Sequence, residues 1–252
     1  MRWRLVIEYE GTDYVGWQAQ QNGRSVQVVL EEALASLFQS EIRVMSSGRT
    51  DAGVHALCQV AAFDAEAVRT PSQVVRGLSN LLPSDVACVA AAAAPDDFDP
   101  RRWVRRKSYR YVWVDREATP ALRRRFVWHI KRPLDVQAMA AASAVLVGRH
   151  DFSSFRAARC NATHAVRILE EVSVRRVGDE VHFVVVGNGF LRHMVRIVAG
   201  SLLQVGLGRF PPTWMADVLE ARDRNKAGLT APAAGLTLIE VEMGDRPRPW
   251  KS

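Results

Sequence analysis

The order of strand and helix patterns leaves this chain few possible folds. In residues 1–100, alternating apolar residues rich in Val, Ile and aromatics predict strands over 3–10, 42–45, 57–65 and 86–94. Two helices are predicted, over 26–38 with Ser25 as N-cap and over 71–82 with Thr70 followed by Pro71. The resulting order is strand, helix, strand, strand, helix, strand.

The second half of the chain repeats this order more loosely. Strands are predicted over 107–115, 168–177, 180–189 and 235–243, and helices over 135–147, from 190 through 203, and after Pro211-Pro212. This order is typical of ferredoxin-like or RRM-like α+β folds, in which helices cover one face of an antiparallel sheet. We expect two such halves. The turn-rich segment 95–102 predicts the boundary, giving domains 1–101 and 102–252.

Charge also changes sign near this boundary. Residues 1–100 carry 7 basic and 13 acidic side chains, whereas residues 101–252 carry 27 and 14. Arginine makes up 30 of the 34 basic residues, and its planar fork can donate two hydrogen bonds to one phosphate. The asymmetry predicts a polyanionic partner, with the runs Arg101–Lys107 and Arg123–Arg125 as candidate phosphate contacts.

Composition excludes several other classes of protein. Apolar residues make up 48% and charged residues 24%, which is typical of a globular domain. The longest apolar run, Val86–Ala94, is shorter than the roughly 20 residues of a membrane span, and the N-terminal segment lacks a secretory signal's apolar stretch. The distant cysteines Cys58, Cys88 and Cys160 argue against a zinc site or a disulfide framework. We expect a cytoplasmic protein with no metal site.

The segment SSGRTDAGVHA, residues 46–56, contains the candidate chemistry. Asp51 lies two residues after Arg49, so an extended backbone would place both side chains on the same side. An arginine beside a carboxylate keeps it ionised, as a nucleophile requires. Gly48 and Gly53 would permit a tight turn. The same composition is common in ordinary turns, and exposed ion pairs are usually solvated. These residues alone therefore fit either a catalytic carboxylate or an ordinary surface turn.

This segment resembles the signature of the tRNA pseudouridine synthase A (TruA) family. The resemblance extends, in the family's order, over IEYEGTDYVGWQAQ, RSVQVVLEEAL, NLLPSDV, DDFDPRRWVRRKSYRY, GRHDFSSFRA, GFLRHMVRIVAG and GLTLIEV. Together these segments span nearly the whole chain. Thr237 stands where members often carry an aromatic residue, and Leu191-Arg192 occupies a variable place. Both departures concern the packing of substrate rather than the activity.

The resemblance implies a homodimeric enzyme with its active-site cleft between the two halves. It would convert uridine to pseudouridine at tRNA positions 38, 39 and 40, without cofactor or metal. Asp51 matches the family's nucleophile, and Arg49 matches the arginine that pairs with it and helps to hold the extruded nucleotide. Tyr109 matches the tyrosine that lies against the target base. Arg192 and Arg196, four residues apart on the predicted helix, would form a basic stripe that contacts the anticodon arm.

Several alternatives remain open from the sequence. Asp51 would attack C1′ or C6 of the nucleotide, or assist loss of the C2′ proton. The competing functions are a non-catalytic RNA-binding module, which would not need Arg49 and Asp51 between glycines, and a hydrolase with Asp51 as nucleophile. His55 and Tyr111 are predicted to be structural. Trp17 could contact RNA or fill a small hydrophobic cluster, and we expect the cluster.

Overall fold

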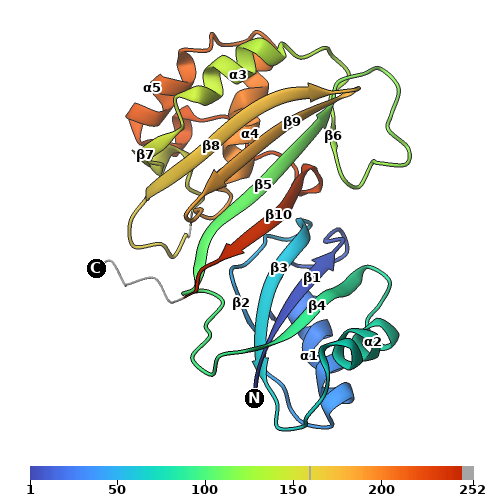
Figure 1. Cartoon of the computed structure of the whole chain (residues 1–252). Helices are drawn as coiled ribbons and strands as arrows, with labels where there is room; N and C mark the ends of the chain where they lie inside the picture. Colours follow the sequence, from blue (N-terminus) through green and yellow to red (C-terminus); the bar gives the residue numbers. More distant parts are fainter. Residues whose placement is uncertain (159, 246–252) are drawn as a thin grey trace. The chain divides into compact units, whose positions relative to one another are not determined.

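The computed structural model describes residues 1–158 and 160–245, and it separates into two compact units (Figure 1). The first unit contains Met1–Arg105 together with residues 238–245, and the second contains Arg106–Thr237. The last strand is therefore part of the first unit, although it follows the second unit in the sequence.

The first unit is a sheet with two helices. Its elements are β1 (Arg2–Tyr9), α1 (Val26–Phe38), β2 (Met45–Ser46), β3 (His55–Asp64), α2 (Pro71–Leu81), β4 (Val86–Ala94) and β10 (Leu236–Met243). The strands lie in the order β4-β1-β3-β10, with β2 paired to β3. Strand β1 runs antiparallel to both β3 and β4. Alternate residues of β1, from Trp3 to Tyr9, are buried, as the sequence pattern predicts.

Both predicted helix starts in this unit are confirmed. The Ser25 hydroxyl accepts a hydrogen bond from the Val28 amide at the start of α1. At the start of α2, Thr70 and Gln73 form a reciprocal capping box, and Pro71 takes the first helical position. These local hydrogen bonds satisfy amides that have no partner within the helix, which is why the sequence alone located them.

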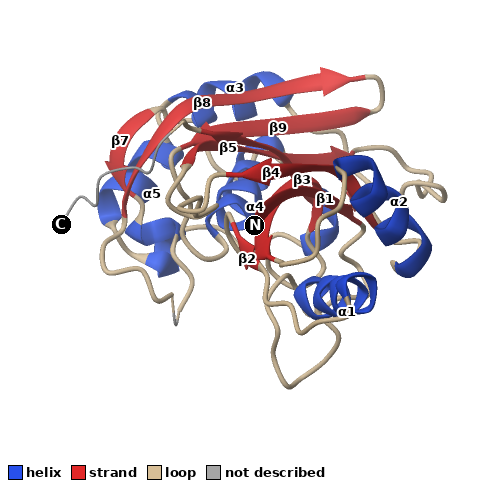
Figure 2. Ribbon diagram, turned by 60° about the horizontal axis from the view of Figure 1, so that its bottom comes forward, coloured by secondary structure: helices blue, strands red, loops and turns tan. Residues whose placement is uncertain are grey.

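The second unit is also an antiparallel sheet with helices. Its elements are β5 (Val104–Val114), β6 (Trp128–His129), α3 (Val136–Ala144), β7 (Gly148–Asp151), β8 (Val166–Val177), β9 (Glu180–Gly187), α4 (Met194–Gly206) and α5 (Trp214–Ala221). The strand order is β5-β9-β8-β7, with β6 parallel to β5. Figure 2 shows α3 lying along β8. Gly178, with φ +61°, forms the predicted turn between β8 and β9.

The predicted α+β class with antiparallel sheets is confirmed, but the predicted start of α4 is wrong. The helix begins at Met194 rather than at Phe190, because His193 has a left-handed backbone with φ +60° that a helix cannot include. Arg192 therefore precedes the helix, and the predicted helical stripe of Arg192 and Arg196 does not form. No described helix is long and apolar enough to cross a membrane.

Candidate active site

Asp51 lies in the loop that joins β2 to β3, and its side chain is half-buried. The Asp51 carbonyl accepts a hydrogen bond from the Val54 amide at 3.1 Å, which closes a tight turn. Gly53 occupies this turn with φ +77°, a conformation that side chains disfavour. The predicted role of Gly53 is therefore confirmed.

Buried side chains anchor the segment that directly precedes Asp51. Gln59, which is fully buried on β3, donates to the Gly48 carbonyl at 2.7 Å and accepts from the Ser47 hydroxyl at 2.6 Å. The Thr50 and Tyr9 hydroxyls share a buried hydrogen bond of 2.8 Å. Burial raises the pKa of Tyr9 well above its usual value, so this phenol keeps its proton. The backbone around Asp51 is thus held by two strands.

The segment 11–17 packs its backbone directly against the Asp51 loop. Gly53 donates to the Tyr14 carbonyl, and Trp17 donates to the Thr50 carbonyl, each at 3.2 Å. Gly16 has φ +108°, and a Cβ there would lie 2.6 Å from the Thr50 carbonyl oxygen. A side chain at this glycine would therefore push the two segments apart.

The structural prediction for His55 is confirmed. Its side chain is only 2% exposed, and its Nδ1 accepts the Gly11 amide at 3.0 Å. A Cβ at Gly11 would lie 2.0 Å from the Val54 carbonyl oxygen, so this position also admits no side chain. Gly11 and Gly16 have a supporting role that sequence reasoning missed, because their contacts lie about 35 to 45 residues further along the chain.

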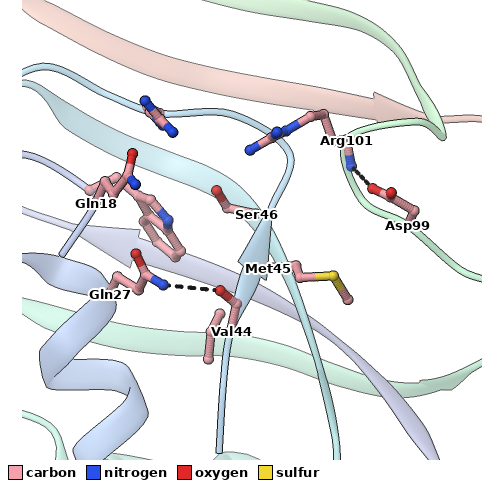
Figure 3. Close-up of a pocket in the computed structure, with 9 residues that line it drawn as sticks. Gln18, Gln27, Val44, Met45, Ser46, Asp99 and Arg101 are labelled. Atoms are coloured by element: carbon pink, nitrogen blue, oxygen red, sulfur yellow. Dashed lines mark hydrogen bonds between the residues drawn. The ribbon is translucent and has the colours of Figure 1, made fainter.

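Beside the loop lies a pocket of about 250 Å³ within the first unit (Figure 3). Its lining residues are Trp17, Gln18, Gln27, Val44, Met45, Ser46, Arg49, Asp99 and Arg101. Trp17 is 2% exposed, and its ring centroid lies 6.0 Å from that of Tyr9, which confirms its predicted place in a hydrophobic cluster. Arg49 is exposed at this pocket, and within residues 1–158 and 160–245 its side chain makes no ion pair, so the predicted pair of Arg49 with Asp51 is not formed.

Tyr109 and Tyr111 lie on β5 in the second unit. The Tyr109 side chain is 8% exposed and meets Phe190 edge to face, with 4.9 Å between ring centroids. Tyr111 is fully buried and donates its hydroxyl to the Pro232 carbonyl at 2.9 Å. The core position predicted for Tyr111 is confirmed, whereas contact of Tyr109 with a base stays a prediction.

The two arginines around the start of α4 have different surroundings. Arg196 is half-buried, and its Nε donates to the Ala231 carbonyl at 2.7 Å, which ties α4 to the following loop. Arg192 is exposed and lines a cavity of about 610 Å³, together with His193 and Arg224. Arg192 therefore has the freer guanidinium of the two.

Several arginines in the predicted phosphate-binding runs already form ion pairs within their own unit. Arg105 pairs with Asp245 at 2.8 Å, and Arg123 pairs with Glu180 at 2.6 Å. The carboxylate partners are distant in the sequence, so the sequence alone does not show that these arginines are paired. Local charge density therefore overestimates the number of arginines available to a polyanion.

Comparison with known proteins adds a family to this geometry. The model of a family described as tRNA pseudouridine synthase matches residues 5–101 and 142–242, which include the Asp51 loop and the start of α4 but not Tyr109. Three relatives bear the name tRNA pseudouridine synthase A. The one from Myxococcus xanthus is 53% identical, over 98% of this chain and 93% of its own length. The one from Pelobacter propionicus is 47% identical, over 94% and 98%. The one from Xylella fastidiosa strain M23 is 45% identical, over 95% and 93%.

Proposed function

This chain belongs to the tRNA pseudouridine synthase family, and on that premise we propose that it converts uridine to pseudouridine in tRNA with Asp51 as nucleophile. We assign its targets to positions 38, 39 and 40 of the anticodon arm. The observation that carries the proposal is the anchored Asp51 loop, which lies within the range matched by the family model.

The reaction is an isomerisation and consumes no second reactant. The bond between ribose C1′ and uracil N1 breaks, the base turns, and C1′ joins C5. The C5 proton is lost and N1 gains one, so the atoms balance without a cofactor. An anchored carboxylate suits each of the three routes, which are attack at C1′, attack at C6 and removal of the C2′ proton.

The enzyme must first take the uridine out of the RNA stack, because the reacting atoms are not accessible inside a stem. Such extrusion costs a few kcal/mol, which contacts to the flipped nucleotide offset. We assign Arg49 to holding this nucleotide and Tyr109 to the face of its base, where an aromatic ring can stack. Arg192 and Arg196 are assigned to the anticodon arm.

Release of tritium from tRNA labelled at uridine C5 tests the activity directly. Wild-type protein should release the label to water, and Asp51→Ala should lower the rate by at least about a thousandfold while tRNA binding survives. Asp97→Asn, which removes an exposed carboxylate elsewhere in the same unit, is the control and should keep the wild-type rate. Near wild-type turnover by Asp51→Ala would refute the nucleophile assignment.

The same assay separates the competing functions. A non-catalytic RNA-binding module would bind tRNA without releasing tritium, and a hydrolase would cleave a substrate without forming pseudouridine. We further propose that the protein works in the cytoplasm as a homodimer. Light scattering should then give twice the chain mass of 28.1 kDa.

A further inference from the structure

The pocket beside the Asp51 loop is lined by apolar, polar and charged side chains (Figure 3). Among them, Trp17 and Val44 are nearly fully buried, at 2% and 5% exposed. Arg49 and Arg101 also line the pocket, and both side chains are exposed. They come from separate parts of the first unit, Arg49 from the Asp51 loop and Arg101 from the turn before β5.

Several arginines of the chain are held by carboxylates, whereas the guanidinium groups of Arg49 and Arg101 have no such partner among the described residues. Within residues 1–158 and 160–245, neither group makes a hydrogen bond or an ion pair. By contrast, Arg105 and Arg123 are held by carboxylates. An unpaired arginine retains all five of its donors, and two such groups at one pocket favour an anion with several acceptor oxygens.

Asp99 also lines the pocket, but its carboxylate is engaged by the backbone. Its Oδ1 accepts the amides of Arg101 at 2.8 Å and Arg102 at 3.2 Å. In Figure 3, the Arg101 side chain extends from this turn toward Ser46, away from Asp99. Asp99 thus fixes the turn that presents Arg101, and its own charge is partly compensated by the two N–H groups.

We propose that Arg49 and Arg101 together bind one phosphate of the tRNA backbone, next to the uridine that Asp51 modifies. This inference rests on the proposed function. Arg49 is separated from Asp51 by one residue, so a phosphate held here belongs to a nucleotide close to the target. The volume of about 250 Å³ lies below the roughly 300–1,000 Å³ of pockets that enclose drug-sized molecules, and it suits a small anionic group.

Arg101 therefore fixes the register of the RNA without touching the reacting atoms. Its loss should weaken binding and leave chemistry intact once the enzyme is saturated. The contribution is electrostatic, so it should depend on salt: each phosphate contact adds about 0.7 to 0.9 to the slope of log affinity against log salt. Contact with phosphate also carries no base preference, so every tRNA substrate should be affected alike.

The test compares Arg101→Ala with Arg76→Ala, a change on α2. Both positions are exposed in the first unit, both changes remove one positive charge, and only Arg101 lines the pocket. Binding of unmodified tRNA is measured in the Asp51→Asn background over a salt series. We expect Arg101→Ala to weaken binding about tenfold and to lower the salt slope by about one, with Arg101→Lys recovering the slope. The affinity of Arg76→Ala for tRNA should stay within about twofold of the parent value.

Turnover with Asp51 intact completes the test. Arg101→Ala should raise KM and keep kcat. Equal effects of Arg101→Ala and Arg76→Ala on binding, or an unchanged salt slope in Arg101→Ala, would overturn the phosphate assignment. Failure of the proposed function has a different signature, because the wild-type protein would then release no tritium whatever its binding.

Discussion

Asp51 shows how a single residue depends on others that are distant in sequence. Its loop is anchored by Tyr9 from β1, by Gln59 from β3 and by the glycines of segment 11–17. Asp51 itself could be predicted, because its signature is contiguous. The anchors could not, because each acts through tertiary contacts and none has a distinctive local pattern.

Gly16→Ala tests whether turnover depends on the close packing of segment 11–17 against the Asp51 loop. The new Cβ would lie 2.6 Å from the Thr50 carbonyl oxygen, at a position with φ +108°. We expect the protein to lose about 1–3 kcal/mol of stability and turnover to fall about a hundredfold, because small displacements of a catalytic group are costly. Urea unfolding and the tritium assay measure the two effects.

Gly178→Ala is the matched control for this change. It also places a side chain at positive φ, but nothing lies within 4 Å of the new Cβ. Backbone strain alone should lower the free energy of unfolding by about 1–2 kcal/mol and leave turnover unchanged. Similar rates for the two alanine variants would contradict the role given to the contact at Gly16.

Tyr111 provides a pH-dependent prediction. Burial raises the pKa of this phenol far above its ordinary value of about 10, so the folded chain keeps a proton that the unfolded chain loses. The contribution of Tyr111 to the free energy of unfolding is fully present below about pH 10. Above that pH it falls by about 1.4 kcal/mol per pH unit. Tyr111→Phe should flatten that part of the curve, as measured by urea unfolding from pH 8 to 11. An unchanged slope would show that Tyr111 ionises equally in both states.

At the scale of elements, the first residue of a helix could be predicted from the sequence where a side chain caps the helix. The prediction was wrong where backbone conformation alone determines the first residue. Ser25, Thr70 and Asp135 each accept an amide at a helix start. Helix α4 has no such cap, since its start is set by the left-handed His193. Apolar residues continue through this junction, so periodicity extended the predicted helix too far toward the N-terminus. Strand β7 was missed because its four residues, GRHD, show no apolar alternation.

Thr70→Ala should show the energetic value of the capping box on α2. The change removes the acceptor for the Gln73 amide, and we expect a loss of about 1 kcal/mol in unfolding free energy with no change in turnover. Ser79→Ala, an exposed position on the same helix, should alter stability by less than about 0.5 kcal/mol. Equal effects at the two positions would mean that the cap does not stabilise the helix.

At the scale of the whole molecule, charge asymmetry predicted a polyanionic partner but not which arginines are available to it. The sequence gives a net charge of +7, with the excess after residue 100. The structure divides these arginines into paired groups, such as Arg123 with Glu180, and unpaired groups, such as Arg101. Pairing arises from the fold, so composition could not reveal it.

Salt dependence tests this division. Affinity of the wild-type protein for tRNA should fall linearly on a log–log plot against salt concentration. Arg123→Ala should leave the slope close to the wild-type value, because Glu180 already neutralises this group. Filter binding or fluorescence anisotropy at several salt concentrations measures both slopes. A flat wild-type response would contradict electrostatic binding altogether.

The place of β10 has a consequence for how the protein is made. This strand lies beside β3 in the first unit, yet the ribosome synthesises it after the entire second unit. Until then β3, which follows directly from the Asp51 loop, has an edge that only β2 covers in part, and unpaired edges invite association with other chains. The second unit is thus translated while the first is unfinished, and a nascent chain stalled before Leu238 would carry the Asp51 segment in an incomplete sheet.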